Sequence, residues 1–220
     1  MAIAFDAKTA PSTTAGTPHT FSHTCTGTDR VLYVFGHDTN TAGPTIVTGV
    51  TYAGVAMTKV VELDANASFN DRAITMWRLV APATGANNVV VSAAGANNLR
   101  FASSSYTGVD QTTPENGTDT STGTSVATIS TDITTSVADC WMLQFSKDQN
   151  GNRTYTNSTG DNIRNNTDAG GHMFCDTDAS FSAGLNTITN TMTSTSLGAL
   201  AVAIRPVAAA TNTGNFFAFF

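Results

Sequence analysis

The clearest indication of the fold is the nearly continuous apolar run Val31-Leu32-Tyr33-Val34-Phe35, which predicts a strand in the middle of a sheet. The run Cys140-Trp141-Met142-Leu143-Gln144-Phe145 predicts a second core strand. Around these two runs, short apolar or alternating segments recur between turn residues, and almost none has a helical period. This pattern is typical of a sandwich or a barrel.

Two local patterns refine this prediction. Phe21, His23 and Cys25 alternate with polar residues, so all three are expected on one face of a strand. Ala53-Gly54 separates two alternating runs and predicts a tight hairpin turn.

Polar stretches interrupt the strands in two places. Residues 110–125 and 147–167 are rich in Thr, Asn, Gly and Asp, and we expect both to be surface loops. Strands are expected again over Val126–Ile133, Leu185–Met192 and Leu197–Ile204. About a dozen strands at this spacing favour an all-β fold of two packed antiparallel sheets, a jelly-roll-like β-sandwich.

The chain is predicted to contain one β-sandwich domain over residues 1–206, followed by a small-residue linker and an aromatic tail over 207–220. Phe216, Phe217, Phe219 and Phe220 could each bury about 150–250 Å². One interpretation folds this tail back onto its own domain, and the other inserts it into a neighbouring subunit. We take these four residues as an assembly anchor.

Charge is scarce in this 220-residue chain: charged residues make up 12%, against about 25% in a typical domain, and the formal net charge is -6. Without a run of Lys or Arg, no nucleic acid partner is expected. No apolar stretch approaches 18 residues, so no membrane partner is expected either. The Thr- and Asn-rich composition is common in extracellular and virion β-proteins.

The first eight residues, 1–8, lack a charged region followed by a long apolar stretch, so we expect no secretory signal and synthesis in a cytoplasm. Cys25, Cys140 and Cys175 are odd in number and widely spaced, which predicts reduced core residues.

Metal sites and catalytic motifs are weakly indicated. His19 and His23 lie four residues apart, as zinc ligands on one strand face could, but no further ligand pattern surrounds them. Asp176 and Asp178 have the alternating spacing of calcium ligands, yet turn residues are the favoured interpretation. No nucleophile elbow or P-loop occurs. We therefore predict no cofactor, no metal and no enzymatic activity.

Aromatic residues offer another binding chemistry. Trp77, Trp141 and Tyr106 could together form a platform on which a sugar stacks. Core packing is the favoured role for Trp141, because it lies in an apolar run. Trp77 is expected to face away from Ile74 and Met76 in its strand.

Three segments together resemble a widespread group of β-sandwich proteins encoded by bacteriophages, prophages and bacteria. They are residues 50–60 (VTYAGVAMTKV), 77–85 (WRLVAPATG) and 106–114 (YTGVDQTTP). The resemblance covers about residues 45–115, with a looser likeness over Leu197–Pro206 and at the aromatic C-terminus. For phage members it implies a virion role in capsid decoration, a head fibre or the tail, and it brings no catalytic residues.

The expected function is therefore that of a phage virion structural protein, made in the host cytoplasm and located in the virion. It would form homo-oligomers and bind other virion proteins through its sheet edges, N-terminal strand and aromatic tail. One alternative is a carbohydrate-binding module or adhesin head that grips a cell-surface glycan. Others are an extracellular filament subunit and a jelly-roll hydrolase or lyase, which would need converging carboxylates or a metal-binding histidine cluster.

Overall fold

The computed structural model describes residues 1–38, 46–64, 73–95, 98–149, 155–157, 162–167 and 171–208. Its elements are all β-strands, which confirms the all-β class. The strands are β1 (Ala4–Ala15), β2 (His19–Cys25), β3 (Val31–Asp38), β4 (Val47–Tyr52), β5 (Val55–Ala56), β6 (Thr58–Leu63), β7 (Ile74–Val80), β8 (Gly85–Ala93), β9 (Asn98–Thr107), β10 (Glu115–Thr135), β11 (Trp141–Asp148), β12 (Tyr155–Asn157), β13 (Asn162–Thr167), β14 (His172–Asp176) and β15 (Gly184–Ile204). The described part of the chain has no helix with the length and apolar character that a membrane crossing needs.

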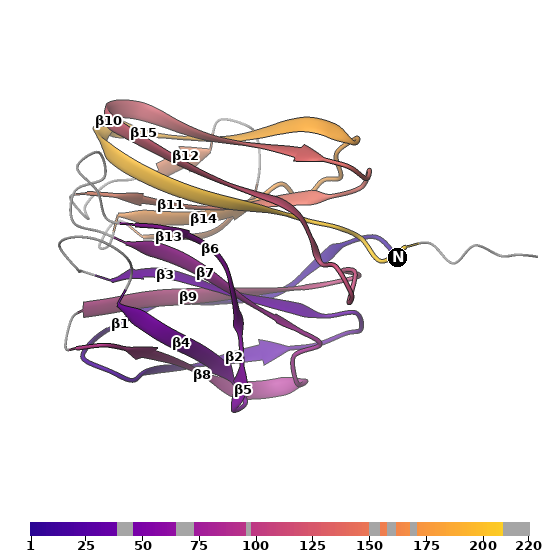
Figure 1. Ribbon diagram of the computed structural model, residues 1–220, viewed down its shortest axis with the longest axis horizontal. Coiled ribbons are helices and arrows are strands. Elements are labelled where there is room, and N and C mark those ends of the chain that lie inside the picture. Colours follow the sequence, from indigo (N-terminus) through magenta and orange to yellow (C-terminus); the bar gives the residue numbers. More distant parts are fainter. Residues whose placement is uncertain are drawn as a thin grey trace, which may run out of the picture.

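Three antiparallel sheets are stacked in layers, with one sheet in the middle (Figure 1). The central sheet has five strands in the order β1-β9-β3-β7-β6. A four-stranded sheet, β2-β8-β4-β5, covers one of its faces. A six-stranded sheet covers the other face in the order β10-β15-β11-β14-β13, with β12 paired to β15.

The third layer follows from the sequence of β3. Val31, Tyr33 and Phe35 belong to the core shared with the six-stranded sheet. Leu32 and Val34 belong to the core shared with the four-stranded sheet. A strand that is apolar on both faces must be covered twice, so the expected two sheets are three in the structure, and β3 is the middle strand of the central one.

The local patterns are confirmed. Phe21, His23 and Cys25 are buried on one face of β2 while their neighbours are exposed. Ala53 and Gly54 join β4 to β5 with φ angles of 50° and 79°, the left-handed pair that a two-residue hairpin turn requires. Of the described cysteines, all three are buried and none forms a disulfide.

The predicted loop over residues 110–125 is wrong. From Glu115 onward this stretch belongs to β10, and the two strands expected near the C-terminus are one strand, β15, paired with β10 along its whole length. Thr and Ser side chains suit a half-exposed pleated surface, and the pairing itself uses only backbone groups, so low hydrophobicity did not prevent a strand. Within the second predicted loop, β11 extends to Asp148 and both β12 and β13 form. Apart from Gln149, the remainder of that loop lies outside the described residues.

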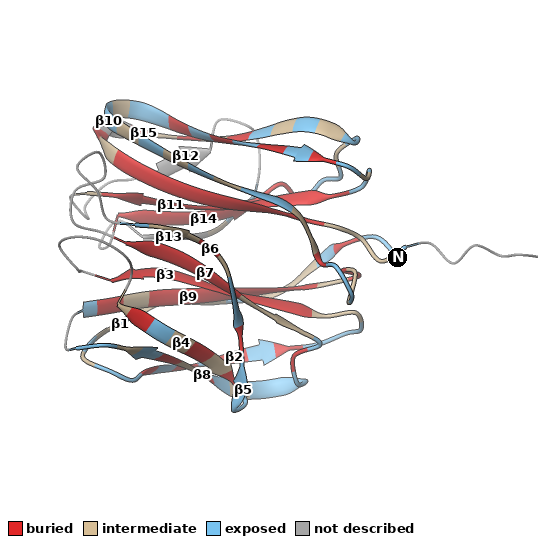
Figure 2. Ribbon diagram, in the orientation of Figure 1, coloured by how far each residue is buried: buried red, intermediate tan, exposed pale blue. Residues whose placement is uncertain are grey.

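The far half of the β10–β15 pair folds over the back of its own sheet. Register shifts interrupt the pairing on both sides of Val126. Beyond them, Ile129 and Ile188 pack with Met142 and Met173, which form a third core on the outer face of β11 and β14. Figure 2 shows the buried residues concentrated in the inner layers and many exposed residues along the outer β10–β15 pair.

Candidate functional site

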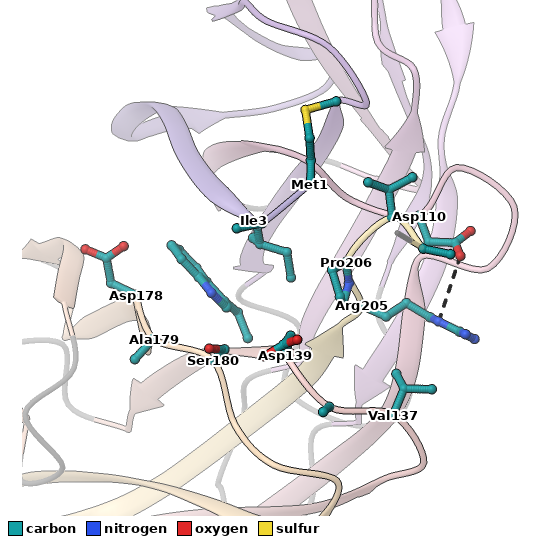
Figure 3. Close-up of a pocket in the computed structure, with 15 residues that line it drawn as sticks. Met1, Ile3, Asp110, Val137, Asp139, Asp178, Ala179, Ser180, Arg205 and Pro206 are labelled. Carbon is teal, nitrogen blue, oxygen red and sulfur yellow. Dashed lines mark ion pairs between the residues drawn. The ribbon is translucent and has the colours of Figure 1, made fainter. Parts of the chain in front are cut away.

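A hollow of about 740 Å³ lies at one end of the molecule, where the first and the last described segments meet (Figure 3). Four stretches contribute most of its walls: residues 1–3, the loop 137–139 before β11, the loop 178–180 after β14, and residues 205–208. Ile3 and Pro206 face the space from opposite sides in Figure 3. The hollow therefore depends on segments that are far apart in the sequence.

Gly108 holds the N-terminal wall in place. Its φ is +69°, and a Cβ atom at this position would lie 2.1 Å from the carbonyl oxygen of Ala2. Only glycine combines that backbone angle with such a close approach of another backbone. This contact brings Ala2 against the end of β9 and leaves Ile3 buried at the floor of the hollow.

The opposite wall continues β15 beyond its last regular residue. The N–H of Asp110 donates to the carbonyl of Arg205 over 3.0 Å, and the N–H of Val207 donates to Gly108 over 2.9 Å. Pro206, which has no N–H to donate, forms an isolated bridge with Val109. These hydrogen bonds fix the segment that leads into the C-terminal tail.

Charged groups surround the rim of the hollow. Arg205 lies 4.0 Å from the carboxylate of Asp110, and its Nη1 donates to Thr113 Oγ1 over 3.0 Å. Backbone N–H groups of Thr113 and Thr112 lower the pKa of Asp110, and Arg205 adds to this. The Nε of Arg205 is the atom that lies 4.0 Å from Asp110 Oδ2, and this buried donor has no acceptor within hydrogen-bond distance among the described residues. It is a donor that a bound group could satisfy.

The three candidate sugar-stacking residues do not form one platform. Trp77 lies in the core beneath the four-stranded sheet, away from Ile74 and Met76 as expected. Trp141 and Tyr106 lie in the opposite core, where their rings meet edge to face with centroids 6.3 Å apart. Of the three, Trp141 alone lines the hollow, and 7% of its surface is exposed.

His19 and His23 are buried hydrogen-bonding residues. His23 Nδ1 lies 3.0 Å from Thr9 Oγ1 and 2.9 Å from Ser103 Oγ, while Nε2 lies 3.0 Å from Ser105 Oγ. Burial lowers the pKa of His23 to about 4, and nearby Asp6 opposes this shift. Among the described residues, no three His, Cys, Asp or Glu side chains gather as metal ligands would.

Ser105, His23 and Asp6 resemble a catalytic triad in composition but not in arrangement. Ser105 donates to Asp6 over 2.7 Å, so the carboxylate contacts the serine instead of orienting the histidine. Ser105 is fully buried, which leaves no room for a substrate beside its hydroxyl. The group joins β1, β2 and β9.

The two candidate calcium ligands pair with an arginine. Asp176 accepts two hydrogen bonds from Arg164, over 2.6 and 2.9 Å, and one from the Tyr106 hydroxyl over 2.7 Å. Burial raises the pKa of Asp176, and these donors act against that shift. Asp178 lies 3.4 Å from the same guanidinium. Arg164 therefore takes the place that a cation would occupy.

A buried charged cluster at the ends of β3, β11 and β14 was not predicted from the sequence. His37 and His172 approach with ring centroids 6.0 Å apart. Lys147 Nζ lies 3.1 Å from Asp148 Oδ1, and Asp38 accepts a hydrogen bond from the backbone of Ile46. The available signal was a pair of titratable residues that follows each apolar run after one intervening residue: His37 and Asp38 after residues 31–35, and Lys147 and Asp148 after residues 140–145.

The predicted anchor residues Phe216, Phe217, Phe219 and Phe220 lie outside the described residues. The described chain stops at Ala208, which is exposed and lines the hollow. The linker that carries the four phenylalanines therefore begins at this site.

Comparisons with known proteins do not identify the chain. No protein-family model and no curated protein matches it. One similar solved structure is a protein from Eubacterium rectale described as a candidate secreted protein. It is 11% identical, with a TM-score of 0.25, over 86% of this chain and 70% of the other.

Proposed function

We propose that the protein is a structural component of a phage virion, in a capsid decoration, head fibre or tail-associated role, and that it assembles through the end that carries its tail. The observation behind this proposal is that the N-terminal residues and the root of the aromatic tail line the same hollow. A hollow from whose edge an aromatic tail extends suits attachment to another subunit. Its partners would be further copies of the chain and other virion proteins.

Strand order supports a jelly-roll sandwich as the basis of this function. The central sheet contains β1-β9-β3-β7, with β6 beside β7, and the four-stranded sheet is β2-β8-β4-β5. Only Met57 separates β5 from β6, so the two can be counted as one fifth strand. The first sheet then has the order one, eight, three, six, and the second has the order two, seven, four, five. This alternation between two sheets is that of a jelly roll, an architecture that occurs in viral capsid and lectin domains.

The outer face of the β10–β15 pair supports a location outside cells. Ser130 and Thr189 lie opposite each other with their hydroxyl oxygens 2.7 Å apart, and Thr128 pairs with Thr191. Such a face is hydrated without long charged side chains.

Assembly is tested by light scattering after size exclusion, with negative-stain imaging, on the full chain and on the variant F216S/F217S/F219S/F220S. We expect a defined oligomer for the full chain and a smaller species for the variant. A full chain that stays monomeric at every concentration would argue against a structural role.

A carbohydrate-binding function is the second candidate, because Trp141 and the carboxylates of Asp139 and Asp178 line one hollow. A glycan array with the full chain tests it. Binding to one sugar class that is lost in Ala179→Trp, at a hollow residue, and kept in Ala56→Trp, at an exposed residue of β5, would favour this function. An array without binding would exclude it.

A further inference from the structure

The tail begins where the hollow opens. Seven residues, 209–215, separate Ala208 from Phe216, and they are Ala, Thr, Asn and Gly. Fully extended, they span at most about 25 Å, so the four phenylalanines stay within reach of this end of the molecule. They can enter the hollow of a second copy only if that copy presents the same end.

The hollow has the size and chemistry to take aromatic side chains. Its volume of about 740 Å³ falls within the range of about 300–1,000 Å³ that is usual for ligand pockets. Ile3, Trp141 and Pro206 give it apolar walls, and Ala138 and Ala179 are exposed small residues that leave space beside them.

A tail from another copy fits this site better than the chain's own tail. Residues 205–208 form one wall, so a tail returning to its own hollow would have to reverse its direction within the seven residues 209–215. A partner's tail approaches from solvent and needs no reversal. The root of the tail and the hollow lie at the same end of the molecule. Two copies that face each other with this end can therefore each insert a tail into the hollow of the other. A two-fold axis relates the two copies, so the assembly is complete as a dimer.

We propose that the hollow is the receptor for the aromatic tail of a second copy, and that two copies exchange tails to form a dimer. This inference rests on the assembly function proposed above. It names Phe216, Phe217, Phe219 and Phe220 of one copy as the inserted groups. The receptor is the hollow between Ile3 and Pro206 of the other copy.

The experiment compares four full-length chains by light scattering after size exclusion. They are the natural sequence, the tail variant F216S/F217S/F219S/F220S, the hollow variant A138W/A179W and a control, A56W/A127W, which adds two tryptophans at exposed positions of β5 and β10. Far- and near-ultraviolet circular dichroism verifies that each chain is folded. If the double hollow variant misfolds, Ala138→Trp and Ala179→Trp are tested singly.

We expect dimers for the natural sequence and the control, and at least tenfold weaker dimerisation for the tail and hollow variants. An equimolar mixture of those two variants is expected to form a heterodimer, since one intact tail then meets one intact hollow. A hollow variant that dimerises as well as the natural sequence overturns the receptor site while assembly stands. A mixture without heterodimer overturns exchange between copies, and a natural sequence that is monomeric overturns both proposals.

Discussion

His23 shows how one buried side chain can connect three strands. Its imidazole lies between Thr9 of β1 and Ser103 and Ser105 of β9, although it belongs to β2. All three partners are hydroxyls, which can donate or accept, so a neutral imidazole is satisfied at both nitrogens. Alternation along β2 predicted that His23 points inward. It could not predict partners that lie about 80 residues away.

Acid is expected to destabilise the protein through this residue. The pKa of His23 is about 4 in the folded chain and near 6.5 in the unfolded chain, so between these values the unfolded chain binds more protons. The free energy of unfolding should therefore fall from pH 6.5 to pH 4, by about 3 kcal/mol for this group. His19, whose pKa burial also lowers, acts in the same direction. Urea unfolding across this pH range measures the loss.

The control for this prediction is His23→Gln. It should be less stable than the natural sequence at pH 7, because hydroxyl partners lose their hydrogen bonds, but it should lose less stability on acidification. An unchanged dependence on pH in this variant would show that other groups cause it.

At the scale of elements, a polar network holds the far half of the β10–β15 pair on β11. Gln144 Nε2 donates to Thr131 Oγ1 over 2.7 Å and to the carbonyl of Ile188 over 3.2 Å. Asn190 donates to Gln144 Oε1, and to Ser146 Oγ over 2.9 Å. These groups are buried among the aliphatic residues of the third core, so each depends on the others for its hydrogen bonds.

Replacing two members of this network together should cost less than the two single replacements added up. Gln144→Leu removes the hydrogen bond to Thr131 Oγ1 and one of the two acceptors of the Asn190 amide, and we expect a loss of about 1–3 kcal/mol in the free energy of unfolding. The double variant Gln144→Leu/Asn190→Leu removes both polar ends and should lose less than the sum of the single variants. Chemical denaturation of the natural sequence, Gln144→Leu, Asn190→Leu and the double variant gives the coupling energy between the two amides. Additive losses would mean that the two amides act independently.

The sequence predicted elements well where apolar residues mark them, as in the alternating β2 and the continuously apolar β3. It failed for β10, because a strand whose exposed face is Thr, Ser and Asp resembles a loop in composition. The hollow could not be predicted at all. Its walls come from residues 1–3, 137–139, 178–180 and 205–208, and only the folded backbone shows that these stretches meet.

For the whole molecule, polar contacts at two carboxylates tie the central sheet to the six-stranded one. Tyr33 of β3 donates to Glu115 of β10 over 2.8 Å, and Arg78 of β7 pairs with the same carboxylate. Tyr106 of β9 reaches Asp176 of β14 in a similar way. The layers therefore share both apolar cores and directed hydrogen bonds, and we expect them to unfold together.

If two copies exchange tails, thermal stability should depend on protein concentration. Dimerisation stabilises the folded state by mass action, so a tenfold rise in concentration should raise the Tm of the natural sequence by roughly 1–3 °C. The Tm of F216S/F217S/F219S/F220S should not change. Differential scanning calorimetry at several concentrations measures both. Equal behaviour of the two chains would contradict a tail-dependent dimer.

The position of β15 has a consequence for the time course of synthesis. This strand is made last among the fifteen, yet it lies between β10 and β11 in the six-stranded sheet. At about 5–20 residues per second, the roughly 70 residues between Thr135 and Ile204 take several seconds to translate. Throughout that interval β10 waits without its partner, a long unpaired edge that could join other chains. Its Thr, Ser, Gly and Asp content, which made it look like a loop, keeps the nascent chain soluble until β15 emerges.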